Sequence, residues 1–257
     1  MRRFWIPCCC ASMICAAIGA AGDVQAAEPA PVNLATLEWH PYTGSELPAQ
    51  GAVSDVVRLT FETADIKIKL SFHAWKDAVD VAAGGWVDGY FPGYHCKHHP
   101  TGKFIASDPI SKTSLGFAFH KKKRLRHWQG LQSAAGKTVG YVKGYASTPE
   151  FEAMEKAKEI GVIRADSDSF NMQQLAKRQL DLVLIDEYVF EYLIKTDPAV
   201  MPHRKQLSFH PRPIDIKNLY LCLRDTPKHR ALMARFNAAL AGLNPEKLIY
   251  GYFRKVF

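Results

Sequence analysis

The chain has 257 residues and a formal net charge of +8, and charged residues make up 23% of it and hydrophobic residues 47%. That length suits one or two compact units, and that composition excludes an intrinsically disordered chain and a membrane protein with many spans. The positive charge by itself invites a nucleic-acid-binding interpretation.

Residues 1–26 have the pattern of a cleaved secretory signal peptide. Two arginines form a charged start, an uncharged apolar stretch covers 5–21, and the residues at 24–26 match the small-residue cleavage pattern. The sequence therefore predicts a periplasmic protein. The apolar stretch is short for a membrane span, and the residues before Cys15 do not match a lipid-attachment site, so we expect neither a retained anchor nor a lipid anchor.

The predicted cleavage leaves two of the six cysteines, Cys96 and Cys222. An oxidising compartment permits a disulfide between them. The sequence supplies no geometry, however, and so it leaves open whether the two are joined.

A basic run covers 121–124 and Arg126. An exported protein rarely meets nucleic acid, and a short run of charge usually lies in a solvated turn. We therefore expect no nucleic-acid partner.

Hydrophobic periodicity predicts two successive α/β units. In the first unit it predicts strands at 32–38, 66–72 and 88–91 and helices at 54–64, with Ser54 as its cap, and at 75–83. In the second it predicts strands at 138–142, 162–165 and 182–185 and helices at 148–160, 169–178 and 187–194. Two more helices are predicted at 227–240 and 245–257.

Two extended apolar runs, 115–120 and 219–223, are expected to cross between the units. The predicted fold is therefore α/β, with two mainly parallel sheets that have helices on both faces and are joined by two hinge strands. We expect one lobe from 27–117 plus 220–257 and the other from 118–219. A ligand would lie in the cleft at the carboxyl ends of the strands.

Several short segments carry a resemblance to a known family. They are Trp39-His40-Pro41-Tyr42, Trp75 at a helix start, Val87-Asp88-Gly89, Ser107-Asp108-Pro109-Ile110, the residues 136–140 and the residues 180–186. In order and spacing they resemble the bacterial extracellular solute-binding proteins of family 3, the periplasmic components of polar-amino-acid ABC transporters. The resemblance implies the two-lobed type II periplasmic-binding-protein fold and delivery of a small solute to an inner-membrane permease. It implies a monomer without a cofactor or a catalytic residue.

Aromatic side chains are the first candidate ligand contacts. Trp39, Tyr42 and Trp75 each follow a predicted strand or open a helix, where a side chain faces the cleft. Such rings can sandwich a ligand and attract a cation by about 0.5 to 2 kcal/mol. The alternative is that they pack the rim of the cleft. The resemblance favours a ligand contact for Trp75.

Asp186 follows the predicted strand 182–185 directly. In the resembling family an aspartate at this point holds the ligand's amino group. The alternative role is the N-cap of the helix that follows, and the two roles are compatible.

The remaining candidates lie in two loops. Amides of the segment 144–148 are expected to form an anion-binding helix start. In the resembling family small hydroxylated residues there bind the ligand's carboxylate, whereas this chain has Tyr145 and Ala146, with Ser147 shifted along. Gly93, Tyr94 and His95 complete the predicted binding set.

One departure from the family bears on the ligand. The family has an arginine seven residues before the Ser-Asp-Pro element, where it grips the α-carboxylate with two hydrogen bonds, and this chain has Pro100. Lys97, His98 and His99 lie close by but cannot reproduce that fork. We therefore expect an amine or another small polar solute, and not a standard α-amino acid.

The same residues raise three other functions: metal binding, catalysis and ligand sensing. His95, Cys96, His98 and His99 contain metal-binding side-chain types, but their spacing matches no zinc motif, and we expect no metal. Periplasmic dehydratases share the resembling fold. His95, Lys97 and Asp186 would be the acid–base candidates, yet no nucleophile and base pair stands at a recognisable spacing. The sequence does not separate transport from ligand sensing for a membrane receptor.

Overall fold

The computed structural model of the chain describes residues 1, 30–96, 99–123, 125 and 127–256. Apart from Met1, the predicted signal peptide lies outside the described residues, as do Lys97, His98, Arg124 and Arg126. Among the described residues, no helix combines the length and the apolar character needed to cross a bilayer.

The first lobe is a small sheet with helices on both faces. Its strands are β1 (Val32–Thr36), β2 (Ile68–Phe72), β3 (Gly89–Gly93) and β4 (Phe104–Ala106). Its helices are α1 (Ala52–Thr63), α2 (Trp75–Ala83), α6 (Pro227–Ala241) and α7 (Pro245–Val256). β1 pairs in parallel with β2 and β3, and α2 packs on the opposite face from α1, α6 and α7.

Helix α1 shows why these residues fold as they do, and it corrects one prediction. Its apolar residues recur at helical spacing and are buried, but Ser54 is not the cap: it is fully buried inside the helix. The residue before the helix is Gly51, at φ 106°, and a Cβ there would lie 2.5 Å from the Tyr42 carbonyl oxygen. Only glycine allows that close approach, and the helix therefore begins earlier than predicted.

The second lobe repeats the plan. Its strands are β6 (Thr138–Val142), β7 (Gly161–Ala165), β8 (Leu182–Asp186) and β9 (Leu207–Phe209). Its helices are α3 (Pro149–Lys156), α4 (Asp168–Ala176) and α5 (Glu187–Thr196). β6 pairs in parallel with β7 and β8. Helix α3 ends earlier than predicted because Lys158 turns the chain at φ 58°.

Strand β8 is buried on both faces, as is typical of a parallel sheet. Val183 and Ile185 belong to the core beneath α4 and α5, whereas Leu182 and Leu184 belong to the core beneath α3. This alternation explains why the predicted apolar run is continuous. It also carries Asp186 to the carboxyl end of the strand.

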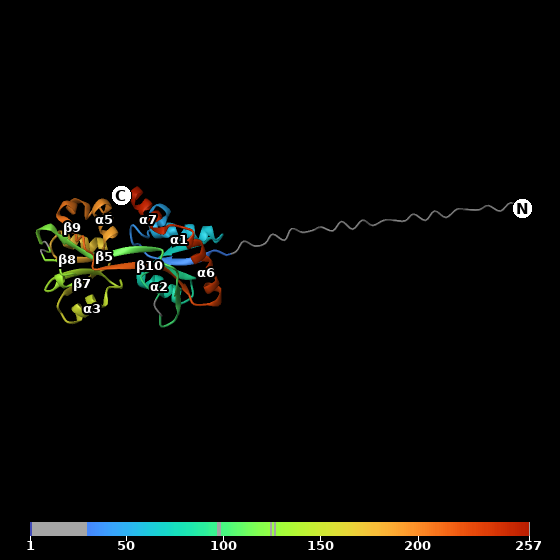
Figure 1. Cartoon of the computed structure of the whole chain (residues 1–257), viewed down its shortest axis with the longest axis horizontal. Helices are drawn as coiled ribbons and strands as arrows, with labels where there is room; N and C mark the ends of the chain where they lie inside the picture. Colours follow the sequence, from blue (N-terminus) through green and yellow to red (C-terminus); the bar gives the residue numbers. More distant parts are fainter. Residues whose placement is uncertain (2–29, 97–98, 124, 126, 257) are drawn as a thin grey trace.

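Two long antiparallel strands join the lobes: β5 (Ser111–His120) and β10 (Asp215–Arg224). Residues 215–219 of β10 pair with β5, and residues 220–224 pair with β3 and β4. β5 in turn pairs with β8. Both strands extend beyond the predicted runs and lie side by side in the middle of the molecule (Figure 1). The predicted α/β fold with two mainly parallel sheets and two connecting strands is thus confirmed.

The two lobes also touch directly on the side where α5 and α7 lie (Figure 1). The rings of Tyr188 in α5 and Phe253 in α7 are 4.4 Å apart, and Tyr42 meets Phe253 edge to face at 5.6 Å. One hydrophobic core continues through this contact from the first lobe into the second.

Cys96 and Cys222 form a disulfide with a Cα–Cα distance of 5.4 Å, which answers the question that the sequence left open. It ties the loop after β3 to strand β10. The two cysteines are 126 residues apart, so the bond closes a long loop of chain.

Replacing both cysteines with serine is expected to lower the free energy of unfolding by about 2 to 5 kcal/mol, because the bond restricts the unfolded chain. Chemical denaturation of the wild type and the double variant measures the difference. Treatment of the wild type with a reductant should give the same loss, and should leave the double variant unchanged. Equal midpoints for all four samples would contradict this expectation.

Candidate functional site

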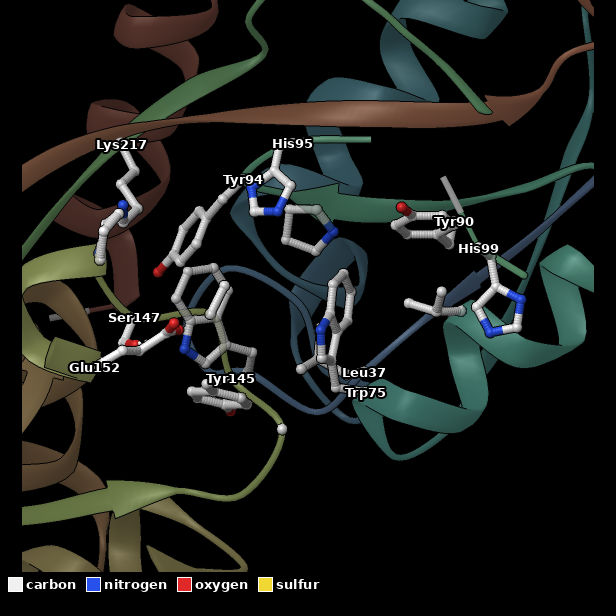
Figure 2. Close-up of a pocket in the computed structure, with 16 residues that line it drawn as sticks. Leu37, Trp75, Tyr90, Tyr94, His95, His99, Tyr145, Ser147, Glu152 and Lys217 are labelled. Carbon is white, nitrogen blue, oxygen red and sulfur yellow. Dashed lines mark hydrogen bonds between the residues drawn. The ribbon is translucent and has the colours of Figure 1, made fainter. Parts of the chain in front are cut away.

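A cleft of about 700 Å³ lies between the two lobes. Its lining residues come from both lobes and from β10: Leu37, Trp39, Trp75, Val79, Tyr90, Pro92, Tyr94, His95, His99, Gly144, Tyr145, Ala146, Ser147, Pro149, Glu152 and Lys217. In Figure 2, Tyr145, Ser147 and Glu152 approach from one side and Trp75 and Tyr90 from the other. That volume is in the range of pockets that bind small molecules.

The cleft brings most of the predicted binding residues together. Those that line it are Trp39, Trp75, Tyr94, His95, Tyr145, Ala146 and Ser147. Tyr42, Gly93 and Asp186 do not line it. Gly93 faces the disulfide instead, since a Cβ there would lie 3.0 Å from the Cys222 sulfur.

Two groups of packed aromatic rings line the cleft. Trp39 meets the ring of Tyr94 edge to face at 6.2 Å, and Trp75 meets Tyr90 in the same way at 5.6 Å. Trp39 also stacks on Tyr42 at 4.4 Å, with Tyr42 fully buried behind it. The rings therefore hold one another in place, which favours a preformed site over one that must be ordered by the ligand.

A smaller recess continues inward from the cleft. It shares Trp39, Tyr94, Tyr145 and Ala146 with the cleft and has a volume of about 10 Å³, which is room for roughly one water-sized group. The residues that line only the recess are Leu115, Tyr141, Asp168, Leu184, Ile185 and Asp186. Two carboxyl groups therefore face the same small space.

Asp186 caps a helix, which is one of the two roles that the sequence allows, and it also lines the recess. Its Oδ1 accepts hydrogen bonds from the amides of Tyr188 and Val189, at 2.9 and 3.1 Å, and so caps α5. The Tyr42 hydroxyl donates to the same oxygen at 3.0 Å. The side chain is 3% exposed, and no donor among the described residues reaches Oδ2.

Asp168 was not among the predicted site residues. It is the first residue of α4, is buried, and lines the recess with Asp186. Burial raises the pKa of both carboxyl groups to about 7, and the charge of Asp186 adds to the rise at Asp168. None of the described residues that line the recess is a lysine, an arginine or a histidine.

The sequence shows only that Asp168 follows a predicted strand, and the strand order brings it close to Asp186. β7 and β8 flank β6, and all three strands run in the same direction, so residues just beyond their carboxyl ends meet at one edge of the sheet. Asp168 stands three residues after β7, as Asp186 stands at the end of β8. The prediction started the following helix at residue 169 and so left Asp168 in a loop.

The tyrosines around the recess remain hydroxyl donors. Burial raises the pKa of Tyr94, Tyr141 and Tyr145, and the nearby carboxylates raise it further. The Tyr141 hydroxyl is buried and has no partner among the described residues. The recess thus presents a carboxylate oxygen and a hydroxyl that the protein itself does not satisfy.

The serine and threonine hydroxyl groups of the loop before α3 already have partners within the protein. Thr148 caps the helix with its own hydroxyl, which accepts from the Phe151 amide at 3.2 Å. Ser147 donates to Glu152 at 3.0 Å, so a carboxylate already occupies that hydroxyl. These contacts engage both of these hydroxyls of the loop.

Positive charge in the cleft is already partnered. Lys217 pairs with Asp215 at 2.7 Å and lies 5.5 Å from the centre of the Tyr94 ring. His99 meets Asp80 at 3.1 Å, and Pro100 is exposed outside the cleft. No arginine stands among the described residues that line the cleft. Cys96 is held in the disulfide and is not a free metal ligand.

Replacing Asp168 with asparagine is expected to stabilise the unliganded protein above pH 7. The raised pKa means that the folded state holds more protons than the unfolded state between about pH 4 and pH 7. Wild-type stability therefore falls as pH rises through that window, and the variant escapes this loss. The expected gain at pH 8 is on the order of 2 to 3 kcal/mol and should vanish near pH 4.

Melting curves at pH 4, 6 and 8 measure this gain. The matched control is Asp166→Asn, which removes a carboxylate that is 89% exposed and paired only with Lys143 in the described residues. If the stability difference between Asp168→Asn and the wild type does not depend on pH, then the fold does not raise the pKa of the Asp168 carboxyl.

The sequence matches no family model and no curated protein. Solved structures do match. The GluR0 ligand-binding core in complex with L-glutamate is 13% identical, with a TM-score of 0.69, over 89% of this chain and 98% of that one. An amino acid ABC transporter substrate-binding protein, AbpA from Streptococcus pneumoniae bound to L-arginine, is 15% identical, with a TM-score of 0.66, over 87% and 95%.

A third similar structure is a histidine kinase sensor domain with similarity to periplasmic binding proteins. It is 14% identical, with a TM-score of 0.65, over 88% of this chain and 93% of that one. At such identities the likeness shows the fold alone. The chain therefore has the two-lobed architecture of periplasmic binding proteins, which is the architecture that its sequence predicts.

Proposed function

We propose that this chain is an exported receptor that captures a small polar solute between its lobes and delivers it to an inner-membrane ABC permease. The observation that carries the proposal is the cleft of about 700 Å³, which both lobes line with aromatic side chains and which leads inward to a buried carboxylate. Support also comes from the fold, which the substrate-binding protein of an amino acid transporter shares.

Binding would proceed by closure of the lobes about β5 and β10, the two strands that connect them. A solute first meets Trp39 and Trp75 on the first lobe. Tyr145 and Asp186 on the second lobe then add contacts that exist only in the closed form. About 5 kcal/mol of such contacts moves a mostly open protein to a mostly closed one.

The preferred solute carries an amine and need not carry an α-carboxylate. Asp186 offers an unpaired, buried oxygen for an ammonium group. Two features disfavour a carboxylate: no arginine among the described residues lines the cleft, and the Ser147 hydroxyl already donates to Glu152. The solute is therefore an amine or a related small polar molecule.

Capture without chemistry is favoured over catalysis. The acid–base candidates of the enzyme alternative stand apart, since Asp186 lines the inner recess and His95 is exposed at the rim of the cleft. Raised pKa values at buried carboxyls occur in active sites, but they also follow from burial alone.

A second candidate function is ligand sensing for a membrane receptor. The observation that favours it is the similarity to the histidine kinase sensor domain. The capture step is the same in both cases. Co-purification of the liganded protein with a permease supports transport, and co-purification with a kinase supports sensing.

Thermal denaturation with a panel of amines, amino acids and small carboxylates tests the capture step. At a concentration of 100 times its dissociation constant, a true ligand stabilises the folded protein by about 2.7 kcal/mol. Calorimetry then measures its affinity for variants. Trp75→Ala is expected to weaken binding about tenfold or more, since a stacked aromatic side chain is lost.

The control is Trp86→Ala, which removes a tryptophan that is 84% exposed and lies outside the cleft. It should bind as the wild type does. Absence of any ligand in the panel, or unchanged affinity in both Trp75→Ala and Asp186→Asn, would refute capture in this cleft. Asparagine is also a good N-cap, so Asp186→Asn should keep helix α5 intact.

A further inference from the structure

We propose that Asp168 and Asp186 together form a socket for a primary ammonium group, into which the solute inserts its charged end while its body lies in the aromatic cleft. This inference rests on the proposed function and adds to it a second carboxylate and a limit on the size of the charged group.

The oxygen atoms match the donors of an ammonium group. An ammonium of the type R–NH₃⁺ has three N–H donors and no acceptor. Five residues that line the recess carry side-chain oxygens that can receive them: Asp168, Asp186 and the tyrosines Tyr94, Tyr141 and Tyr145. Asp186 Oδ2 and the Tyr141 hydroxyl are buried and have no partner among the described residues.

The size of the recess selects the kind of cation. Its volume of about 10 Å³ admits roughly one water-sized group, and an –NH₃⁺ head is of that size. A trimethylammonium head or a guanidinium is larger. The walls are Tyr94, Leu115 and Tyr145, with rings and an aliphatic side chain that leave little space to widen the recess.

The charge of the recess favours a cation. Burying two carboxyls side by side is costly unless a positive group compensates them. The described residues that line the recess include no cationic side chain, and Lys217, which lines the outer cleft, pairs with Asp215. A bound ammonium would meet both carboxyls at once and neutralise them.

The connection to the cleft fits a ligand with a charged tip and a longer body. Trp39, Tyr94, Tyr145 and Ala146 line both spaces, so a molecule in the cleft reaches the recess between them. The faces of these rings suit the carbon atoms next to an ammonium group. The solute class is therefore a primary amine whose carbon skeleton fills the aromatic cleft.

Isothermal titration calorimetry of the purified protein tests the socket with matched probes. The probes are butylamine, butane-1,4-diamine and 2-phenylethylamine. Each is compared with the analogue in which a trimethylammonium group replaces each amino group. L-norvaline and L-phenylalanine test the effect of an added carboxylate, and calcium chloride tests a metal ion. We expect at least one primary amine to bind, and its trimethylated analogue and carboxylated counterpart to bind at least tenfold more weakly.

Variants test the two acceptor groups that the family resemblance does not assign. Asp168→Asn is expected to weaken amine binding at least tenfold, because it removes a negative charge and one acceptor oxygen. Tyr141→Phe is expected to weaken it several-fold, because it removes a hydroxyl acceptor. The control Asp166→Asn, on the exposed side of the same loop, should leave affinity unchanged. Melting curves of each variant confirm that it is folded before titration.

The outcomes separate this inference from the proposed function. Equal binding of the trimethylated analogue, tighter binding of calcium than of any amine, or unchanged affinity in Asp168→Asn would overturn the socket. Binding of a solute without an amine would also overturn the socket, but it would leave the proposed solute-binding function intact. If no solute of the wider panel binds, both proposals fall.

Discussion

The hydrogen bond between the Tyr42 hydroxyl and Asp186 Oδ1, at 3.0 Å, joins the two lobes at the bottom of the cleft. Asp186 Oδ1 accepts hydrogen bonds from three donors, the Tyr42 hydroxyl and two amides at the start of α5, and so links the helix, the first lobe and the strand end. The other oxygen is left facing the recess. The proposed role of Asp186 depends on this difference between its two oxygens. The fold positions the carboxylate through Oδ1, and Oδ2 remains available to a ligand.

Aromatic packing supports the same arrangement from behind. Tyr42 lies between Trp39, which lines the cleft, and Phe253 of the last helix. Phe253 in turn packs on Tyr188, the residue that donates its amide to Asp186. The polar contact is thus enclosed by rings from both lobes. In that water-poor setting a hydrogen bond or an ion pair is stronger than at the surface, and an unpaired carboxylate is more costly.

The sequence was informative about the fold because each lobe repeats one local pattern. Apolar runs such as 182–185 predicted buried strands, and the polar residue directly after that run predicted the position of Asp186 at a strand end. The cap of α1 was predicted wrongly because the true start depends on Gly51 lying against the Tyr42 backbone, a contact between segments that no local pattern records.

The sequence was less informative about the site, where direction matters as well as position. Trp39 and Tyr42 were predicted as equal partners, yet the loop turns back on itself through the bond from the Tyr42 amide to the Trp39 carbonyl. The two rings therefore lie in series, and only the outer one meets the cleft. Asp168 was missed because its neighbourhood with Asp186 arises from the order of the strands, in which β6 separates β7 from β8.

The disulfide has a mechanical consequence as well as a thermodynamic one. Cys222 belongs to β10, whose other half pairs with the connecting strand β5, and Cys96 sits one residue after His95 in the loop that carries Tyr94. The disulfide therefore couples the position of Tyr94 in the cleft to that of a strand that crosses between the lobes. Without this covalent bond, only noncovalent contacts would hold the loop against β10.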